Sequence, residues 1–458
     1  MNSHTSTGGL RARPARARRP VADALAFKRD PLGFMCRLER DHGPVAPFGL
    51  AGRRAVMVSG PAEIKEVLVT RENDFDKGEL QRKALVPALG KGLLISEGAL
   101  HARQRRMIAP MFAARQLGPY IDPIARTMHR HIRQWPVDSP FTVLDRLKVM
   151  MHDVVGELMT QRPLGHDERL IAGVTRLFEW EMKQLLDPLA APLWLPTRAN
   201  RQMRSDLAEV REEFTKVIGE RRLDRADAAY DDRDVLDHLL SARDPDGAAM
   251  SDEQLIDELI NIWGAAHETS ADAQFWTAYL LATHPEIRDE ARAEAETVLG
   301  GRLPSVEDLP RLQYCGQVFK EAMRLFPPAP CFLRESVRDT RIGEVDVAAG
   351  TLVFLSTFAM HRSPAHYPDP MTFDPRRFTP RAERARDRAT YLPFGIGPRV
   401  CIGGTLAVYE GQIFTAVLLT SGELSFATTP VEPTLLINLR PRGDVPAEFR
   451  PIEERSRQ

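Results

Sequence analysis

A run of about 32 residues without a helix breaker is the feature that most constrains the fold of this 458-residue chain. Ser-Asp-Glu-Gln at 251–254 is a capping box that predicts the start of a helix, and Thr-His-Pro at 283–285 predicts its end. Apolar residues recur between them at spacings of three and four. Such a helix is roughly 48 Å long at 1.5 Å per residue. We therefore expect residues 252–283 to cross the middle of a domain.

Polar side chains stand in the centre of this apolar helix. The sequence Gly-Ala-Ala-His-Glu-Thr-Ser at 264–270 includes Glu268 and Thr269. A buried carboxylate or hydroxyl costs free energy unless it is hydrogen-bonded or used by the protein. A helical threonine can also donate to a carbonyl one turn earlier and open the helix slightly. Glu268 and Thr269 are therefore candidate functional residues, whereas His267 is interpreted as a packing residue.

A glycine-rich loop with a single cysteine, residues 394–403, is the second constraining feature. It reads Phe-Gly-Ile-Gly-Pro-Arg-Val-Cys-Ile-Gly, and its glycines allow a tight turn that aims amide N–H groups at one atom. The apolar residues 402–420 predict a buried helix, whose N-terminus favours a thiolate at Cys401. Cys401 is thus a candidate nucleophile or metal ligand, and Gly403 leaves room for a flat group. The alternative is an inert, buried cysteine in a turn.

The loop resembles the haem-binding loop of the cytochrome P-450 family, the haem-thiolate monooxygenases, with the pattern F-G-x-G-x-R-x-C-x-G. The resemblance implies that Cys401 is the axial ligand of the haem iron. It also implies that Phe394 and Gly403 contact the haem and that Arg399 binds a haem propionate.

The centre of the long helix is similar to the family motif A-G-x-(Asp/Glu)-T. The resemblance implies that Glu268 and Thr269 are the acid–alcohol pair that delivers protons over the distal face of the haem. The chain departs from the motif at Ala266, where the family usually has glycine. We expect the extra methyl group to narrow the groove beside the helix.

Two basic segments complete the expected haem contacts. His101 and Arg105 are four residues apart on one face of a basic helix that follows Ser96-Glu97-Gly98. By itself this pattern describes a solvated basic face. In the family, however, H-x-x-x-R reaches a haem propionate, so the resemblance implies that His101 and Arg105 do so. Arg334, at the start of a strand region, resembles the propionate-binding arginine of the family.

A second motif pair is expected to be structural. Glu321 and Arg324 are three residues apart in the helix predicted over 312–326, which ends at two prolines. The sequence at 370–378 matches the family pattern P-x-x-F-x-P-x-R-F. The resemblance implies a buried Glu321–Arg324–Arg377 network beneath the haem, which must be fully hydrogen-bonded to be tolerated.

Composition narrows the functional classes. The 62 Lys and Arg residues nearly balance the 63 Asp and Glu residues, so no nucleic-acid partner is expected. The four cysteines lack Cys-x-x-Cys spacing, which indicates neither a zinc site nor a disulfide framework and favours a reducing, cytoplasmic setting. No transmembrane segment is expected, because no run reaches the ~18 apolar residues of a span. The arginine-rich residues 1–24 are expected to form a disordered basic arm.

The expected architecture is a mostly α cytochrome P-450 fold, with a long central helix and a small β-sheet region. Residues 25–458 form a single catalytic domain, with the haem between the 252–283 helix and the 394–420 Cys loop and helix. Residues 74–94 are expected to be irregular. The proline-broken apolar loop at 188–196 is expected to be a lid over the substrate channel, as the resemblance implies, or an ordinary packed connection.

The resemblance implies a bacterial-type monooxygenase with haem b, which inserts one oxygen atom from O₂ by hydroxylation or epoxidation. The apolar lid favours a lipophilic substrate, such as a terpenoid, fatty acid or carotenoid. The alternatives are a peroxygenase or isomerase of the same fold, or a non-catalytic haem sensor. Glu268 and Thr269 argue against all three.

The chain has no segment for a fused reductase and no cysteine set for an iron–sulfur cluster. Electrons from NAD(P)H are therefore expected through a separate ferredoxin or flavodoxin with its reductase. The basic residues around Arg103, Arg106 and Arg115 are the expected docking face for that partner.

Overall fold

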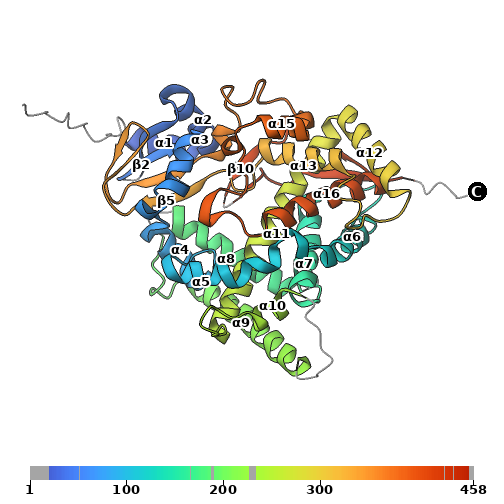
Figure 1. Cartoon of the computed structure of the whole chain (residues 1–458), viewed down its shortest axis with the longest axis horizontal. Coiled ribbons are helices and arrows are strands. Elements are labelled where there is room, and N and C mark those ends of the chain that lie inside the picture. The colour runs from blue at the N-terminus through green and yellow to red at the C-terminus, as the bar shows by residue number, and fades with distance from the viewer. Residues whose placement is uncertain are drawn as a thin grey trace, which may run out of the picture.

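The computed structural model of the protein describes residues 20–50, 52–165, 167–186, 190–225, 234–427, 429–436 and 438–452. Helices predominate in these ranges, and strands of the largest sheet lie beside the N-terminal helices, on the left of Figure 1. The mostly α class predicted from the sequence is confirmed.

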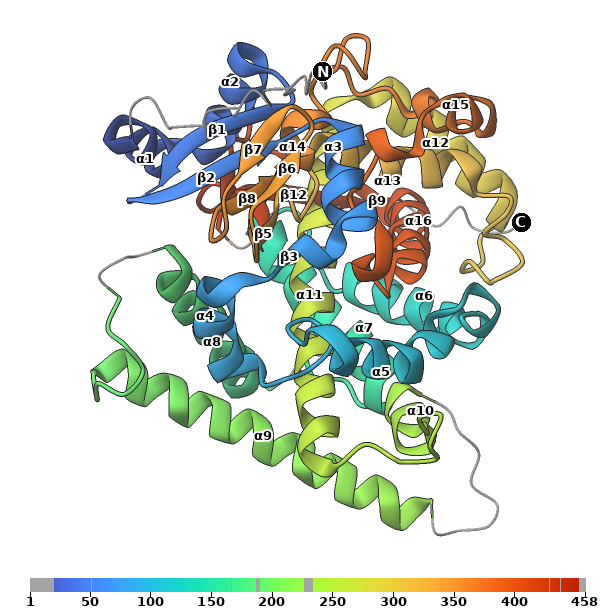
Figure 2. The same cartoon turned by 60° about the vertical axis from the view of Figure 1, so that its left-hand side comes forward.

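Helix α11, Asp252–Thr283, has 32 residues and the predicted bounds. It passes through the middle of the molecule in Figure 2. The Ser251 hydroxyl accepts the N–H of Gln254 at 3.2 Å, as a helix N-cap does. The predicted reciprocal bond is replaced, because the Gln254 side chain accepts from Arg103 at 3.0 Å.

Helices surround α11 and share one large apolar core with it. Trp263 and Trp276 of α11 are among the largest fully buried side chains of this core. The helices that flank α11 most directly are α7 Val143–Thr160, α9 Arg198–Asp224, α13 Gln313–Leu325 and α16 Gly404–Ser421. The other helices in the described ranges are α1 Pro20–Arg29, α2 Pro31–His42, α3 Pro61–Lys65, α4 Gly78–Leu89, α5 Gly98–Ile108, α6 Gly118–Ile132, α8 Glu168–Leu186, α10 Val235–Ser241, α12 Pro285–Leu299, α14 Thr357–Met360 and α15 Pro380–Ala385.

The main sheet has five strands in the order β1-β2-β8-β5-β3. Its strands are β1 Val45–Leu50, β2 Arg53–Val58, β3 Phe75–Asp76, β5 Phe332–Ser336 and β8 Leu352–Leu355. β2 pairs in parallel with β8, and the other pairs are antiparallel. The smaller sheets contain β4 Phe141–Thr142, β6 Thr340–Ile342, β7 Val345–Val347, β9 Gly422–Phe426, β10 Pro433–Leu435, β11 Leu439–Pro441 and β12 Pro446–Pro451.

The prediction that residues 74–94 are irregular is wrong, because α4 occupies Gly78–Leu89. Gly78 at the start has a φ of 74°, and Pro87 lies inside the last turn, so local sequence argues against a helix. The helix forms because Ala84, Ala88 and Leu89 are buried and its side packs on α8.

The predicted boundary of the basic arm, after residue 24, is also wrong. Helix α1 begins at Pro20, a favourable first residue of a helix. The Asp23 carboxylate accepts the N–H of Gly49 in β1 at 3.1 Å, and the Phe27 ring packs on the sheet. Residues 1–19 of the predicted arm, and 187–189 around the start of the predicted lid, lie outside the described residues.

Candidate functional site

The loop before α16 holds Cys401 by a tight backbone turn. Gly395 and Gly397 have φ angles of 72° and 81°, in the left-handed region that glycine favours. A Cβ atom on Gly397 would lie 2.4 Å from the Leu68 carbonyl oxygen, so a side chain is excluded there. The Cys401 N–H donates to the Phe394 carbonyl at 2.9 Å, which closes the turn.

The Cys401 thiol has accessible surface in surroundings that are otherwise enclosed by protein atoms. Its side chain is exposed, yet burial raises the pKa of the thiol. The Gly403 N–H and Arg105 lower that pKa by less. The Gly403 N–H thus acts in the direction expected of a helix N-terminus, but burial outweighs it. A metal cation at the sulfur would supply further stabilisation, since a coordinated thiol is deprotonated.

The centre of α11 also keeps accessible surface. Ala265 is exposed and Thr269 is half-buried, although the helix around them is among the most buried of the protein. The Thr269 hydroxyl donates to the Ala265 carbonyl at 2.7 Å, one turn earlier. Helices α11 and α16 are in contact, and the Ser270 hydroxyl, next to Thr269, donates to the Glu410 carboxylate of α16 at 2.9 Å.

The predicted arginines approach the loop from three elements. Arg105 of α5 donates to the Val400 carbonyl at 2.9 Å. Arg399 pairs with Glu97, at the N-terminus of the same helix. Arg334 of β5 donates to its neighbour's carbonyl at 2.8 Å. These contacts leave donors of each guanidinium for another acceptor, because each group carries five N–H bonds.

The basic residues form a cluster of like charge. Burial, followed by Arg399 and Arg105, lowers the pKa of His101 to about 4. Burial, followed by Arg399, lowers the pKa of Arg334 to about 10. Cations that repel one another in a buried site are a receptor for anions. Two carboxylates, as in the propionates of a haem, fit this donor set.

Lys77 belongs to the same cluster, and sequence reasoning missed it. Burial, followed by Arg334 and Arg399, lowers the pKa of Lys77 to about 7. It precedes α4, in the segment predicted to be irregular. A lone lysine before a glycine carries no sequence signal, so only the fold reveals its place beside the arginines.

The structure also brings the three residues of the expected structural network together. Arg324 donates to both carboxylate oxygens of Glu321, at 2.7 and 2.8 Å, and to the carbonyls of His361 and two further residues. The Arg377 Nε lies 3.4 Å from the Glu321 carboxylate. The same carboxylate accepts the Asp374 N–H at 3.0 Å. Glu321 and Arg324 are fully buried.

Two further predicted residues have partners that bear on their roles. Glu268 faces Lys148 of α7, with 3.8 Å between Nζ and Oε1. Arg103 pairs with Asp244 at 2.7 Å, so its expected place on a free docking face is wrong. Arg106 and Arg115 are exposed.

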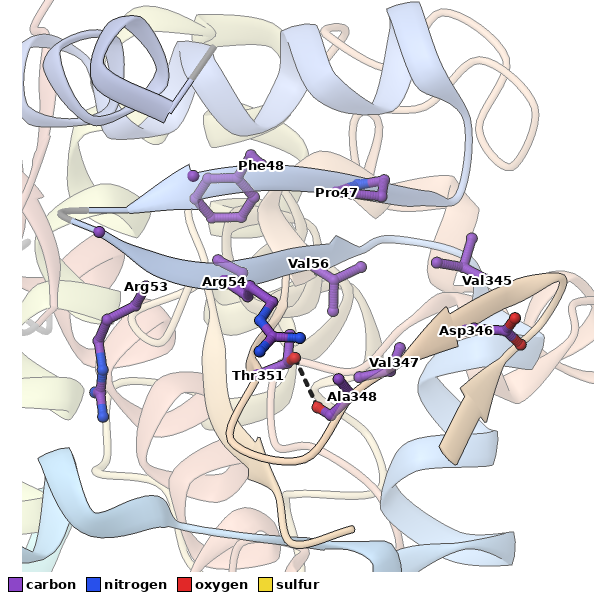
Figure 3. Close-up of a pocket in the computed structure, with 13 residues that line it drawn as sticks. Pro47, Phe48, Arg53, Arg54, Val56, Val345, Asp346, Val347, Ala348 and Thr351 are labelled. Atoms are coloured by element: carbon purple, nitrogen blue, oxygen red, sulfur yellow. Dashed lines mark hydrogen bonds between the residues drawn. The ribbon is translucent and has the colours of Figure 1, made fainter. Parts of the chain in front are cut away.

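A separate groove of about 230 Å³ lies on the main sheet, between the β1–β2 and β6–β7 hairpins (Figure 3). Phe48, Arg54 and Val347 are among its lining residues, and the Thr351 hydroxyl donates to the Ala348 carbonyl at 2.7 Å beside it. No predicted site residue lines this groove. It is therefore distinct from the central site.

The described residues contain no group of three or more His, Cys, Asp or Glu side chains placed to hold a metal ion. A metal at Cys401 would thus be held by one protein ligand, as an iron in a macrocycle is. None of the helices within the described ranges has the length and apolar character that a membrane span requires.

The sequence model described as "Cytochrome P450" matches residues 22–440. Cyclooctat-9-en-7-ol 5-monooxygenase of Streptomyces melanosporofaciens is 31% identical over 88% of this chain and 87% of its own. Pentalenene oxygenase of Streptomyces avermitilis is 30% identical over 87% of this chain and 88% of its own. The crystal structure of the cytochrome P450DA heme domain superposes with a TM-score of 0.84 at 23% identity, over 94% of this chain and 95% of that one.

The chain belongs to the cytochrome P450 family. It is a cytochrome P450 monooxygenase, an oxidoreductase whose cofactor is haem. Its fold is the one expected from the sequence.

Proposed function

We propose that this protein inserts one oxygen atom from O₂ into a lipophilic terpenoid, by hydroxylation or epoxidation, at the space between Cys401 and Thr269. The observation that carries the proposal is that Cys401, in the loop before α16, and Thr269, in the centre of α11, both keep accessible surface although the two helices are among the most buried. The catalytic domain of this proposal begins with α1 at Pro20, and the haem lies between the 252–283 helix and the 394–420 Cys loop and helix.

Cys401 is the axial ligand of the haem iron in this proposal. Haem with a thiolate ligand supplies the activation of O₂, because electron donation from sulfur favours O–O cleavage. Gly403 donates its N–H to the sulfur, and the Phe394 ring covers the start of α16 at Gly404. These contacts orient the Cys401 sulfur, and the haem would supply the oxygen-activating chemistry.

The basic cluster holds the two propionates of haem b. Charge-assisted hydrogen bonds from these residues replace the repulsion among them with attraction to the carboxylates. The low pKa of His101 makes its neutral ring a hydrogen-bonding partner rather than a further positive charge beside the arginines and Lys77. The contributing residues are Lys77, His101, Arg105, Arg334 and Arg399.

Thr269 and Glu268 move protons toward the distal side of the site. Thr269 already donates to a helix carbonyl, so its hydroxyl oxygen is free to accept a second hydrogen bond. Glu268 stands one residue before it, on the side of Lys148. General acid catalysis by such a pair contributes about 10²–10⁴-fold in rate.

A terpenoid substrate is supported by two observations. The relatives are named for cyclooctat-9-en-7-ol and pentalenene. Ile262 and Ala265 are accessible apolar residues near the centre of α11, and Phe332 lies beside the loop at Gly395. Such a lining selects by shape and by apolar surface rather than by charge.

Electrons reach the haem from NAD(P)H through a ferredoxin or flavodoxin with its reductase. Arg106 and Arg115 are exposed basic residues on α5 and just after it, and they form the proposed docking face. Reversing both charges should slow electron transfer and leave the substrate-induced spin-state shift unchanged. The four cysteines are unpaired, which supports the proposed cytoplasmic setting.

The deciding experiment is the absorption spectrum of the reduced protein with carbon monoxide. A strongly red-shifted Soret band is expected, and Cys401→Ala should abolish it. An unshifted band that the variant leaves unchanged would exclude a thiolate ligand and the proposed chemistry.

Thr269→Ala separates a monooxygenase from a haem sensor. In a monooxygenase the variant should consume electrons without forming the normal amount of product. A sensor would retain its ligand binding and show no such uncoupling.

A further inference from the structure

Glu97, at the N-terminus of α5, contacts two other segments that carry residues of the basic cluster. Its Oε1 accepts the N–H of Lys77, just before α4, at 3.1 Å. Its Oε2 accepts from the guanidinium of Arg399, which belongs to the loop before Cys401. Both carboxylate oxygens are therefore used by residues that are distant in the sequence, and the function proposed above gives Glu97 no role.

Stabilisation of its own helix does not account for these contacts of Glu97. The residue has extended backbone angles, φ −129° and ψ 163°, at the N-cap position of α5. A side-chain oxygen at this position commonly accepts an N–H of the first helical turn. The structure shows no such bond from the described first turn of α5 to the Glu97 carboxylate. The side chain is turned toward Lys77 and Arg399 instead.

Two arginines form a reciprocal clamp between α5 and the loop that carries Cys401. Arg399, from the loop, donates to Glu97 at the start of α5. Arg105, from α5, donates in the other direction, to the Val400 carbonyl at 2.9 Å. Arg399 and Val400 are the two residues before Cys401, so the clamp fixes the backbone that leads to the sulfur.

The acceptors of Arg399 also fix the direction in which its guanidinium faces. Nη1 donates to the Ser96 carbonyl at 2.6 Å, and Nη2 donates to Glu97. Two of the five N–H groups are used in this way, so three remain for a propionate. A planar cation held at two corners is already oriented, which reduces the entropy lost when a further carboxylate binds.

The Glu97–Arg399 pair is suited to holding local geometry rather than to stabilising the whole fold. The Arg399 side chain is 17% exposed and the Glu97 side chain is 31% exposed. Ion pairs with this much access to water contribute little to global stability, whereas charge-assisted hydrogen bonds remain directional. We therefore expect loss of Glu97 to affect the Cys401 loop more than the free energy of unfolding.

We propose that Glu97 is a positioning residue for the haem: it aims Arg399 at a propionate and, through the clamp, holds Cys401 in place as the thiolate ligand. The proposal rests on the haem-thiolate function proposed above. Glu97 touches no reacting atom and acts only through Arg399. Without its carboxylate, Arg399 would keep only the Ser96 carbonyl, and the loop would lose one of its bonds to α5.

The carbon monoxide spectrum of the reduced, haem-loaded protein gives the first test. In mild denaturant the red-shifted Soret band should convert to an unshifted band as the thiolate ligand is lost. Glu97→Gln should make this conversion about tenfold faster, because one charge-assisted hydrogen bond of the clamp is lost.

Glu79→Gln is the matched control for this measurement. It removes a carboxylate that pairs with Lys83 at 2.6 Å on the exposed side of α4, away from the clamp. Its red-shifted band should convert at the rate of the unchanged protein. Equal conversion rates in Glu97→Gln and Glu79→Gln would overturn the proposal.

A double-mutant cycle tests whether Glu97 acts through Arg399. Arg399→Gln removes both bonds of the guanidinium and should itself speed the conversion. Adding Glu97→Gln to this variant should then change the rate less than twofold. A contribution independent of Arg399 would appear at full size in both backgrounds, and that result would overturn the proposal.

Amide hydrogen exchange supplies a measurement that needs no Arg399 variant. In haem-loaded Glu97→Gln, peptides from residues 394–403 should exchange about tenfold faster, because the bond from the Cys401 N–H to the Phe394 carbonyl opens more often. Peptides of α13, which carries the buried Glu321–Arg324 pair, should exchange at an unchanged rate. Unchanged exchange in the loop, or equal acceleration in both segments, would overturn the proposal.

The two proposals fail separately. Absence of the red-shifted band in the unchanged protein would remove the haem-thiolate function itself, whatever the Glu97 variants do. A red-shifted band that converts equally slowly in Glu97→Gln would leave that function intact and remove only the positioning role of Glu97.

Discussion

Two buried charge clusters in this protein are built on opposite principles. Around Glu321, every strong donor of Arg324 has an acceptor, and the carboxylate accepts two guanidinium N–H bonds and a backbone N–H. Around Glu268, one lysine stands at 3.8 Å and Glu181 has an unpaired oxygen. The saturated cluster is the Glu321–Arg324 pair itself, because the neighbouring Arg377 Nε has no hydrogen-bond partner among the described residues. This pair is suited to holding the fold rigid, whereas the incomplete cluster around Glu268 leaves polar atoms unpaired.

The largest effect is expected from a substitution that breaks the saturated cluster. Glu321→Gln leaves the Arg324 charge buried without a counter-ion and should lower the free energy of unfolding by about 3–5 kcal/mol. Chemical denaturation measures the change. The control is Glu383→Gln, which breaks the partly exposed pair with Lys320 and should cost only about 0–1 kcal/mol. Similar losses in both variants would contradict the contrast between buried and exposed pairs.

A second prediction concerns the basic cluster around Lys77, Arg334 and Arg399. Its positive charges are only partly balanced by carboxylates of the chain. Lys77→Met should weaken the binding of haem by about 1.5 kcal/mol, because a charge-assisted hydrogen bond to a propionate is lost. Transfer of haem to an acceptor protein should then be about tenfold faster. Lys83→Met, on the exposed side of α4, is the control. Equal transfer rates for both variants would place Lys77 outside the haem contacts.

The smallest effect has the opposite sign and concerns the incomplete cluster. Glu181→Met replaces an unsatisfied acid by an apolar side chain and should raise the free energy of unfolding by about 1 kcal/mol. Thermal or chemical unfolding measures this gain, with Glu181→Gln as the polar comparison. A loss of about 2 kcal/mol or more would show that Glu181 has a stabilising partner, and the contrast with Glu321 would disappear.

Some features of this protein are determined by the sequence alone, because their causes are local. The bounds of α11 follow from a cap at Ser251, a proline at 285 and apolar spacing between them. The turn that presents Cys401 follows from glycines at 395 and 397, which adopt the positive φ angles that the turn requires. Neighbours along the chain are sufficient to specify both.

Only the tertiary structure decided the partners that come from distant segments. Helix α4 forms although it contains Pro87, because one side of it is buried against α8. This packing places Lys77 beside Arg334. Likewise Lys148 approaches Glu268 at 3.8 Å because α7 packs along α11. A side chain's charge and pKa depend on what surrounds it in space, and a single lysine or glutamate in a helix carries no record of those surroundings.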